Sequence, residues 1–192
     1  MTFYSWIIVA LWLIFAAYWI VSARGAKRTI GSAWVRRREA GLRLAILALV
    51  LLALRISIFR HALRNAGFYA VNKSIPMGIA GAALCALGIG LAILARYYLG
   101  RNWGLPMSRK ENPELVTAGP YAFIRHPIYT GLLLAMLGSA IGESIFWLAP
   151  LILCVPYFIY SARREEKLMI EQFPERYPAY IKRTRMLLPF VL

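Results

Sequence analysis

The feature that most constrains this chain is a series of long apolar runs between short charged connections. Residues 2–23 carry no charged side chain, and further apolar runs cover residues 42–59, 75–95, 127–142 and 144–162. A helix needs roughly 20 apolar residues to cross the hydrocarbon core of a membrane. The runs therefore predict an all-α integral membrane protein with about five transmembrane helices, the last two forming a helical hairpin at Glu143. The first run follows Met1 without a basic segment, so we expect it to remain as a membrane helix.

The charged residues predict the orientation of these helices. The net charge is +15, and the basic residues gather in the first connection, in residues 96–126 and in the tail after residue 162. Basic residues collect in cytoplasmic connections of membrane proteins. This places the N-terminus outside, the C-terminus inside, and residues 96–126 beside the tail at the cytoplasmic face. Insertion topology also explains the positive charge without a nucleic-acid partner.

Smaller signals describe the packing. Ala82, Ala86 and Gly90 recur at four-residue spacing, which predicts a close approach by a neighbouring helix. Cys85 and Cys154 lie within apolar runs, so they read as packing residues, and no metal site is expected. The tail alternates charged and apolar residues, which is typical of a short interfacial helix, with breaks expected near Pro174 and Pro178.

The stretch "GPYAFIRHPIYTG", residues 119–131, carries the first candidate chemistry. Proline suits the first position of a helix and disfavours helical geometry in the residue before it. Pro127 should therefore begin a helix, with His126 just outside it. Free backbone N–H groups at a helix start favour an anion, so Arg125 and His126 could receive a carboxylate or phosphate. The alternative is that they simply contact lipid phosphates.

Two carboxylates, Glu165 and Glu166, follow the last apolar run. Carboxylates near a membrane need partners because burying an unpaired charge is costly. Their neighbours Arg163, Arg164 and Lys167 could supply local salt bridges. Alternatively, one glutamate binds a cationic part of a ligand held between the tail and the loop that contains His126. Aromatic faces attract cations, although tyrosines also anchor membrane proteins at the interface; the tyrosines in these two segments are Tyr121, Tyr129, Tyr177 and Tyr180.

The pattern "LVTAGPYAFIRHPIYTG", followed by a hairpin and by "EEKLMIEQFPERYPAYIKR", resembles the isoprenylcysteine carboxyl methyltransferase family, which is related to phospholipid N-methyltransferases. The likeness covers roughly residues 96–192. It divides the chain into three N-terminal spans, residues 1–95, and a methyltransferase-like region, residues 96–192. It implies an integral membrane enzyme that binds S-adenosylmethionine (SAM) at the cytoplasmic face and releases S-adenosylhomocysteine.

The resemblance also assigns residues to roles. It implies that the cofactor contacts Leu115, Val116, Tyr121, His126, Pro127, Tyr129 and Glu165, with Glu165 holding the cofactor's amino group. Arg125, Arg164 and Glu166 are the candidate catalytic residues. In family members that methylate prenylcysteine, an arginine lies one helical turn before the glutamate; that position is Ser161 here, which leaves Arg163 or Arg164 as possible replacements.

The expected reaction is methyl transfer to a lipophilic acceptor, first of all the carboxylate of a prenylcysteine-like substrate. A carboxylate is ionised at neutral pH and needs no base, whereas an amine of a phospholipid must lose a proton, for which Glu166 would be the base. Two other classes remain open: an NADPH-dependent membrane enzyme resembling sterol reductases, and a lipid-binding protein without catalysis. Membrane lipids and a lipophilic substrate are the expected partners, and the sequence identifies no partner protein.

Overall fold

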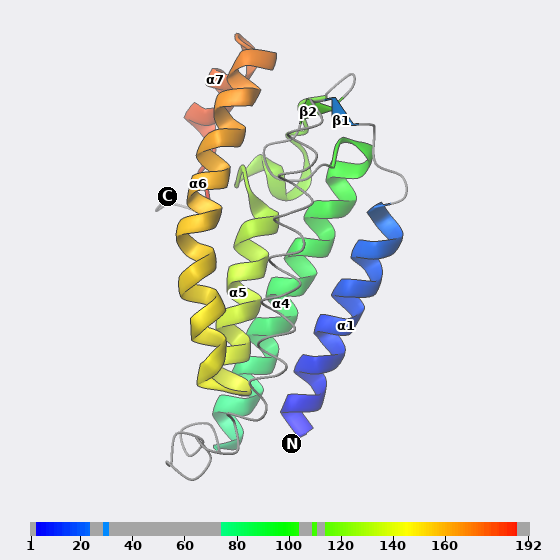
Figure 1. Cartoon of the computed structure of the whole chain (residues 1–192), viewed down its shortest axis with the longest axis vertical. Helices are drawn as coiled ribbons and strands as arrows, with labels where there is room; N and C mark the ends of the chain where they lie inside the picture. The colour runs from blue at the N-terminus through cyan, green and yellow to red at the C-terminus, as the bar shows by residue number, and fades with distance from the viewer. Residues whose placement is uncertain (1–2, 24–28, 31–73, 104–108, 111–113, 188–192) are drawn as a thin grey trace.

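The computed structural model describes residues 3–23, 29–30, 74–103, 109–110 and 114–187 (Figure 1). Its α-helices are α1 (Phe3–Ala23), α4 (Ile75–Leu99), α5 (Pro127–Gly142), α6 (Leu148–Gln172) and α7 (Arg176–Arg183). Single 3₁₀ turns lie at η2 (Gly100–Asn102), η3 (Gly119–Ala122) and η4 (Ile145–Trp147). The two-residue strands β1 (Thr29–Ile30) and β2 (Arg109–Lys110) pair antiparallel. The regular secondary structure of the described chain is therefore helical apart from this short ladder and an isolated bridge between Ile124 and Arg185.

The apolar runs become helices wherever the structure describes them. Residues 3–22 and 75–102 are long and apolar enough to cross a membrane, and α5 is apolar but shorter. The predicted run over residues 42–59 lies outside the described residues. In Figure 1, α1 and α4 run in the same direction, and α5 and α6 run antiparallel to each other. The all-helical prediction is confirmed in this part of the chain, whereas the count of five membrane spans stays a prediction.

Helices α4 and α5 pack with their backbones in close contact. A Cβ atom added to Gly88 would lie 2.4 Å from the Ala135 nitrogen, and one added to Gly138 would lie 2.4 Å from the Cys85 nitrogen. Small residues permit such an approach in membrane helices. The predicted small-residue face was wrong in part, because Ala86 is exposed and an added Cβ at Gly90 meets nothing within 4 Å. The face that packs is Gly81, Cys85, Gly88 and Ala92.

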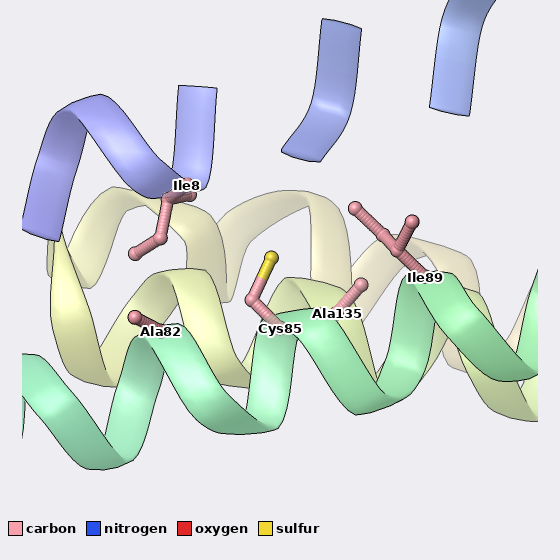
Figure 2. Packing of buried hydrophobic residues seen from close by; sticks show 5 residues of the cluster. All are labelled: Ile8, Ala82, Cys85, Ile89 and Ala135. Atoms are coloured by element: carbon pink, nitrogen blue, oxygen red, sulfur yellow. The ribbon is translucent and has the colours of Figure 1, made fainter. Parts of the chain in front are cut away.

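Helix α1 packs mainly against α4 and also contacts α5. Figure 2 shows Ile8 of α1 above Ala82 and Cys85 of α4, and these residues belong to one buried cluster. Trp12 Nε1 donates a hydrogen bond of 3.0 Å to Ser139 Oγ, and the Trp12 ring stacks on Trp147 at 5.1 Å. The packing role expected for Cys85 is confirmed, since the residue is fully buried.

Helix α6 carries the chain from the hairpin to the tail without a break. It begins at Leu148 rather than Ser144, because η4 forms the preceding turn, and it continues through Pro156 to Gln172. The break expected near Pro174 is confirmed, whereas the break at Pro178 was wrong. Pro178 lies in the first turn of α7, where the backbone N–H groups have no partner within the helix to lose. Both candidate glutamates therefore lie on α6, at the same end of the bundle as α7 (Figure 1).

Candidate functional site

The candidate site is built around the start of α5. His126 is the N-cap residue, with φ −124° and ψ 58°, and Pro127 is the first helical residue. This is the geometry that the sequence predicted for the His-Pro pair. Both residues are buried, so the helix start faces the protein interior.

The chain after α7 holds this helix start in place through its backbone. The Arg125 nitrogen donates to the Arg185 carbonyl at 2.8 Å, the Arg185 nitrogen to the Phe123 carbonyl at 3.1 Å, and the His126 nitrogen to the Met186 carbonyl at 3.1 Å. Thr130 Oγ1 also donates a hydrogen bond to the Leu187 carbonyl. The sequence reasoning missed this pairing, because no residue pattern in 184–187 indicates it.

Arg125 lies inside the protein rather than among lipid headgroups. Its Nε donates to Glu166 Oε1 at 2.6 Å, and the two side chains are only 8% and 12% exposed. A guanidinium nitrogen also donates to the Thr184 carbonyl at 2.7 Å. These contacts tie the α5 start, α6 and the tail together, so the structure favours an internal role for Arg125 over a contact with lipid phosphates.

His126 lies between the two glutamates. Its Nδ1 is 3.5 Å from Glu165 Oε2, and its Nε2 is 3.4 Å from Glu166 Oε1. Burial disfavours the charged imidazolium, but hydrogen bonding and charge attraction from both carboxylates hold the pKa of His126 above its usual range. His126 therefore has an increased tendency to carry a positive charge.

Glu166 lies between two basic side chains, Arg125 and His126. Burial by itself would raise its pKa, but the hydrogen bond from Arg125 and the nearby basic groups of His126 and Arg125 hold the pKa of Glu166 below its usual range. A carboxylate that resists protonation is a poor proton acceptor. This arrangement disfavours the role of general base considered for Glu166 and suits a positioning role.

The Glu165 side chain lies beside the Tyr129 ring and is partly exposed to solvent. Tyr129 Oη donates to Glu165 Oε1 at 2.5 Å, and the Glu165 side chain is 26% exposed. The Tyr129 ring stacks between His126, at 5.5 Å, and Phe158, at 4.6 Å. Glu165 is thus a partly exposed carboxylate that accepts a hydrogen bond from the Tyr129 hydroxyl, and a carboxylate suits a cationic ligand group.

The remaining tyrosines pack beside this cluster. Tyr121, Tyr177 and Tyr180 are all buried, and Tyr180 Oη donates to the Tyr121 carbonyl at 2.6 Å. Burial raises the pKa of Tyr180 to about 12, so its hydroxyl stays a neutral donor at physiological pH. The buried positions favour a structural or ligand-lining role over the alternative of membrane anchoring.

The structure separates the predicted site residues into two groups. It brings Arg125, His126, Tyr129, Glu165 and Glu166 into one network. Leu115 and Val116 are half-buried in the loop before η3, and Arg164 is exposed on α6. Arg164 therefore lies on the surface outside the network.

Two polar residues near the network were not singled out as its members. Thr184 is buried, and its carbonyl and hydroxyl both accept from Arg125. Ser161, at the position of the family arginine, is fully buried, and among the described residues its Oγ has no hydrogen-bond partner. Only the spacing from Glu165 gave a signal for Ser161, and nothing in the sequence marked Thr184.

The fold and this network define a class: a helical membrane protein with a buried, charged site at one end of its bundle. Residues 77–176 match the sequence profile of the phospholipid methyltransferase family, which covers α5, α6 and most of α4. The chain therefore belongs to the phospholipid methyltransferase family, and the resemblance to the related isoprenylcysteine methyltransferases is confirmed.

Individual relatives agree with this family. Over 107 residues the chain is 38% identical to the cobalt-zinc-cadmium resistance protein CzcN of Cupriavidus metallidurans, covering 54% of this chain and 46% of that protein. It is 36% identical over 115 residues to methanethiol S-methyltransferase of Pseudomonas deceptionensis, covering 54% and 42%. It is 26% identical over 144 residues to protein-S-isoprenylcysteine O-methyltransferase B of Arabidopsis thaliana, covering 73% of each chain. The chain spans about half the length of the first two relatives.

Proposed function

We propose that this protein is a SAM-dependent methyltransferase that acts on a lipophilic acceptor within a membrane. The observation that carries the proposal is the buried network in which Arg125 and His126, at the start of α5, meet Glu165 and Glu166 of α6. Membership of the phospholipid methyltransferase family supports the same activity.

The residues of the network fit the charges of SAM. Arg125 pairs with Glu166, and Glu165 is a partly exposed carboxylate next to the rings of His126 and Tyr129. Glu165 would hold the cofactor's ammonium group through charge-assisted hydrogen bonds. When bound, SAM supplies an activated methyl group on a sulfonium, so the protein's main task is to align donor and acceptor.

The acceptor that the site suits best is one that is already nucleophilic at neutral pH. Glu166 is engaged by Arg125 and His126 and has a lowered pKa, so it is a poor base for an ammonium acceptor. A prenylcysteine-like carboxylate needs no base and is our leading acceptor, in agreement with the likeness to isoprenylcysteine O-methyltransferase B. A thiol, which must lose its proton before transfer, is a second candidate because of the likeness to methanethiol S-methyltransferases.

We further propose a multi-pass topology with the N-terminus outside, the C-terminus inside and the site facing the cytoplasm. Two helices have the length and composition of membrane spans, and α1 and α4 run in the same direction, as an intervening span would require (Figure 1). The basic residues of the tail support the cytoplasmic side for the site end.

Calorimetric titration of the detergent-purified protein with S-adenosylhomocysteine tests the cofactor. We expect saturable binding that Glu165→Gln and His126→Ala weaken and that Arg176→Gln, on the exposed start of α7, leaves unchanged. Absence of binding by folded wild-type protein, or binding of NADPH instead, would contradict the proposal.

Transfer of a labelled methyl group from SAM then ranks the acceptors. A farnesyl thioether bearing a cysteine carboxylate, a long-chain alkanethiol and phosphatidylethanolamine represent the three nucleophile classes. Fastest transfer to the carboxylate supports the leading acceptor, and preference for the amine would show that the base argument for Glu166 is wrong.

A further inference from the structure

An open groove of about 790 Å³ lies on another face of the bundle end. It is formed by one side of α4, by the loop from η3 to the α5 start, and by the end of α7. Its lining residues are Leu91, Leu94, Tyr98, Gly119, Pro120, Phe123, Ile124, Lys182, Arg183 and Arg185. The network of Arg125, His126 and the two glutamates is not part of this lining, so the groove is a separate feature.

The charged residues that line the groove are all basic. Lys182, Arg183 and Arg185 are all exposed, and among the described residues no carboxylate lines the groove. The Arg183 guanidinium lies over the Tyr180 ring, 5.7 Å from its centre, which leaves its edge available. Three cationic side chains without a counter-charge in the lining favour an anionic ligand.

The floor of the groove is apolar and belongs to a candidate membrane span. Leu91, Leu94 and Tyr98 follow one face of α4, within the apolar stretch of residues 75–102. Phe123 is 70% exposed and Leu94 is 47% exposed. A small water-soluble anion would gain nothing from contact with this apolar surface, whereas an acyl chain would bury it away from water.

We propose that the groove binds an anionic phospholipid of the surrounding leaflet. Its phosphate contacts Lys182, Arg183 and Arg185, and an acyl chain lies along Leu91 and Leu94. In the orientation proposed above, this end of the bundle meets the cytoplasmic leaflet, where anionic lipids attract basic segments near the surface.

A lipid in this groove joins α4 to the tail. Residues 181–187 hold the α5 start through the Thr184, Arg185 and Met186 carbonyls. A ligand that contacts Leu94 on one side and Lys182 on the other therefore stabilises the docked position of this segment. The bound lipid is thus a structural ligand that supports the site from outside, independently of what the site methylates.

Native mass spectrometry of the full-length protein tests the proposal. The detergent-purified protein is mixed with phosphatidylglycerol and phosphatidylcholine of equal chain length, and retained lipid adducts are compared. A basic residue near an anionic surface contributes on the order of a fivefold gain in affinity. We expect wild type to prefer phosphatidylglycerol, and the triple variant Lys182→Gln, Arg183→Gln, Arg185→Gln to lose at least about tenfold of that preference.

A matched triple variant distinguishes the groove from general positive charge. Arg101→Gln, Lys167→Gln and Arg176→Gln remove the same charge at exposed positions outside the groove lining, and we expect them to keep the preference. Equal loss in both triple variants, equal retention of both lipids by wild type, or displacement of the lipid by millimolar inorganic phosphate would overturn the proposal.

Hydrogen exchange supplies a second measurement that does not require methyl transfer. We expect phosphatidylglycerol to slow exchange of residues 181–187 in wild type and in the control variant, but not in the groove variant. Slowing of equal size in all three proteins would show that the lipid acts elsewhere.

Discussion

Arg125 Nε lies 2.6 Å from Glu166 Oε1 and joins the residue before the α5 N-cap to a carboxylate on α6, at the open end of the helical hairpin. Both side chains are almost fully buried. A buried ion pair is costly to form, but removal of one partner leaves an uncompensated charge in the interior.

Breaking this pair should therefore destabilise the bundle. We expect Arg125→Gln to lower the free energy of unfolding by about 3 kcal/mol, since the largely buried Glu166 loses its guanidinium partner and keeps only His126 nearby. The double variant Arg125→Gln, Glu166→Gln should lose less than the sum of the two single variants. A double-mutant cycle from denaturant unfolding measures the coupling, and strictly additive losses would show that the two residues do not interact.

The paired shifts of His126 and Glu166 predict how stability depends on pH. The pKa of His126 is raised above its ordinary 6.5, so its contribution is fully present below that value and is lost as pH rises through the folded-state pKa. The pKa of Glu166 is lowered from 4.5, so its contribution is present above that value and is lost as pH falls through the folded-state pKa. These two groups together stabilise the protein most between about pH 4.5 and 6.5.

Measurement of the melting temperature across this pH range separates the loss of stability at higher pH, assigned to His126, from the loss at lower pH, assigned to Glu166. His126→Asn should flatten the fall in melting temperature above pH 6.5, because the group that releases its proton is gone. If the melting temperature of that variant still falls above pH 6.5 as it does in wild type, another residue causes the loss of stability.

Two glycines on α4 form a matched pair for testing the contact with α5. A Cβ at Gly88 would lie 2.4 Å from the Ala135 nitrogen, whereas one at Gly90 would meet nothing within 4 Å. We expect Gly88→Ala to lower the free energy of unfolding by about 1–3 kcal/mol, because the two backbones must separate. Gly90→Ala should be neutral or slightly stabilising. Equal effects in denaturant unfolding would mean that α4 and α5 do not pack at Gly88.

Sequence reasoning succeeded where a residue has a local conformational preference. Pro127 fixed the start of α5 and His126 as its N-cap, and the length of the apolar runs located α1, α4 and α5. The basic residues in both segments also predicted correctly that the His126 loop and the α6 glutamates lie at the same end of one hairpin.

The remainder depends on contacts between distant segments. The choice between the Gly90 face and the Gly88 face of α4 is made by α5, since both faces carry small residues. The pairing of residues 185–186 with 123–126 uses backbone groups alone, so no side-chain pattern reveals it. The partners of Glu166 could not be chosen from sequence either, because Arg163 and Arg164 are nearer in the chain than Arg125.

The hydroxyl of Tyr129 gives the sharpest test of Glu165 as the ligand of the cofactor's ammonium group. It donates to Glu165 Oε1 at 2.5 Å, while its ring stacks on His126 and Phe158. Tyr129→Phe removes the hydroxyl and keeps the ring, so the stacking survives. A hydrogen bond to a charged group contributes about 1.5–3 kcal/mol. Loss of this bond leaves Glu165 less firmly oriented, and we expect weaker binding of S-adenosylhomocysteine by about tenfold in calorimetric titration. Tyr160→Phe, on the exposed side of α6, is the matched control and should bind as wild type does. Unchanged affinity in folded Tyr129→Phe protein would argue that Glu165 does not hold the ammonium group.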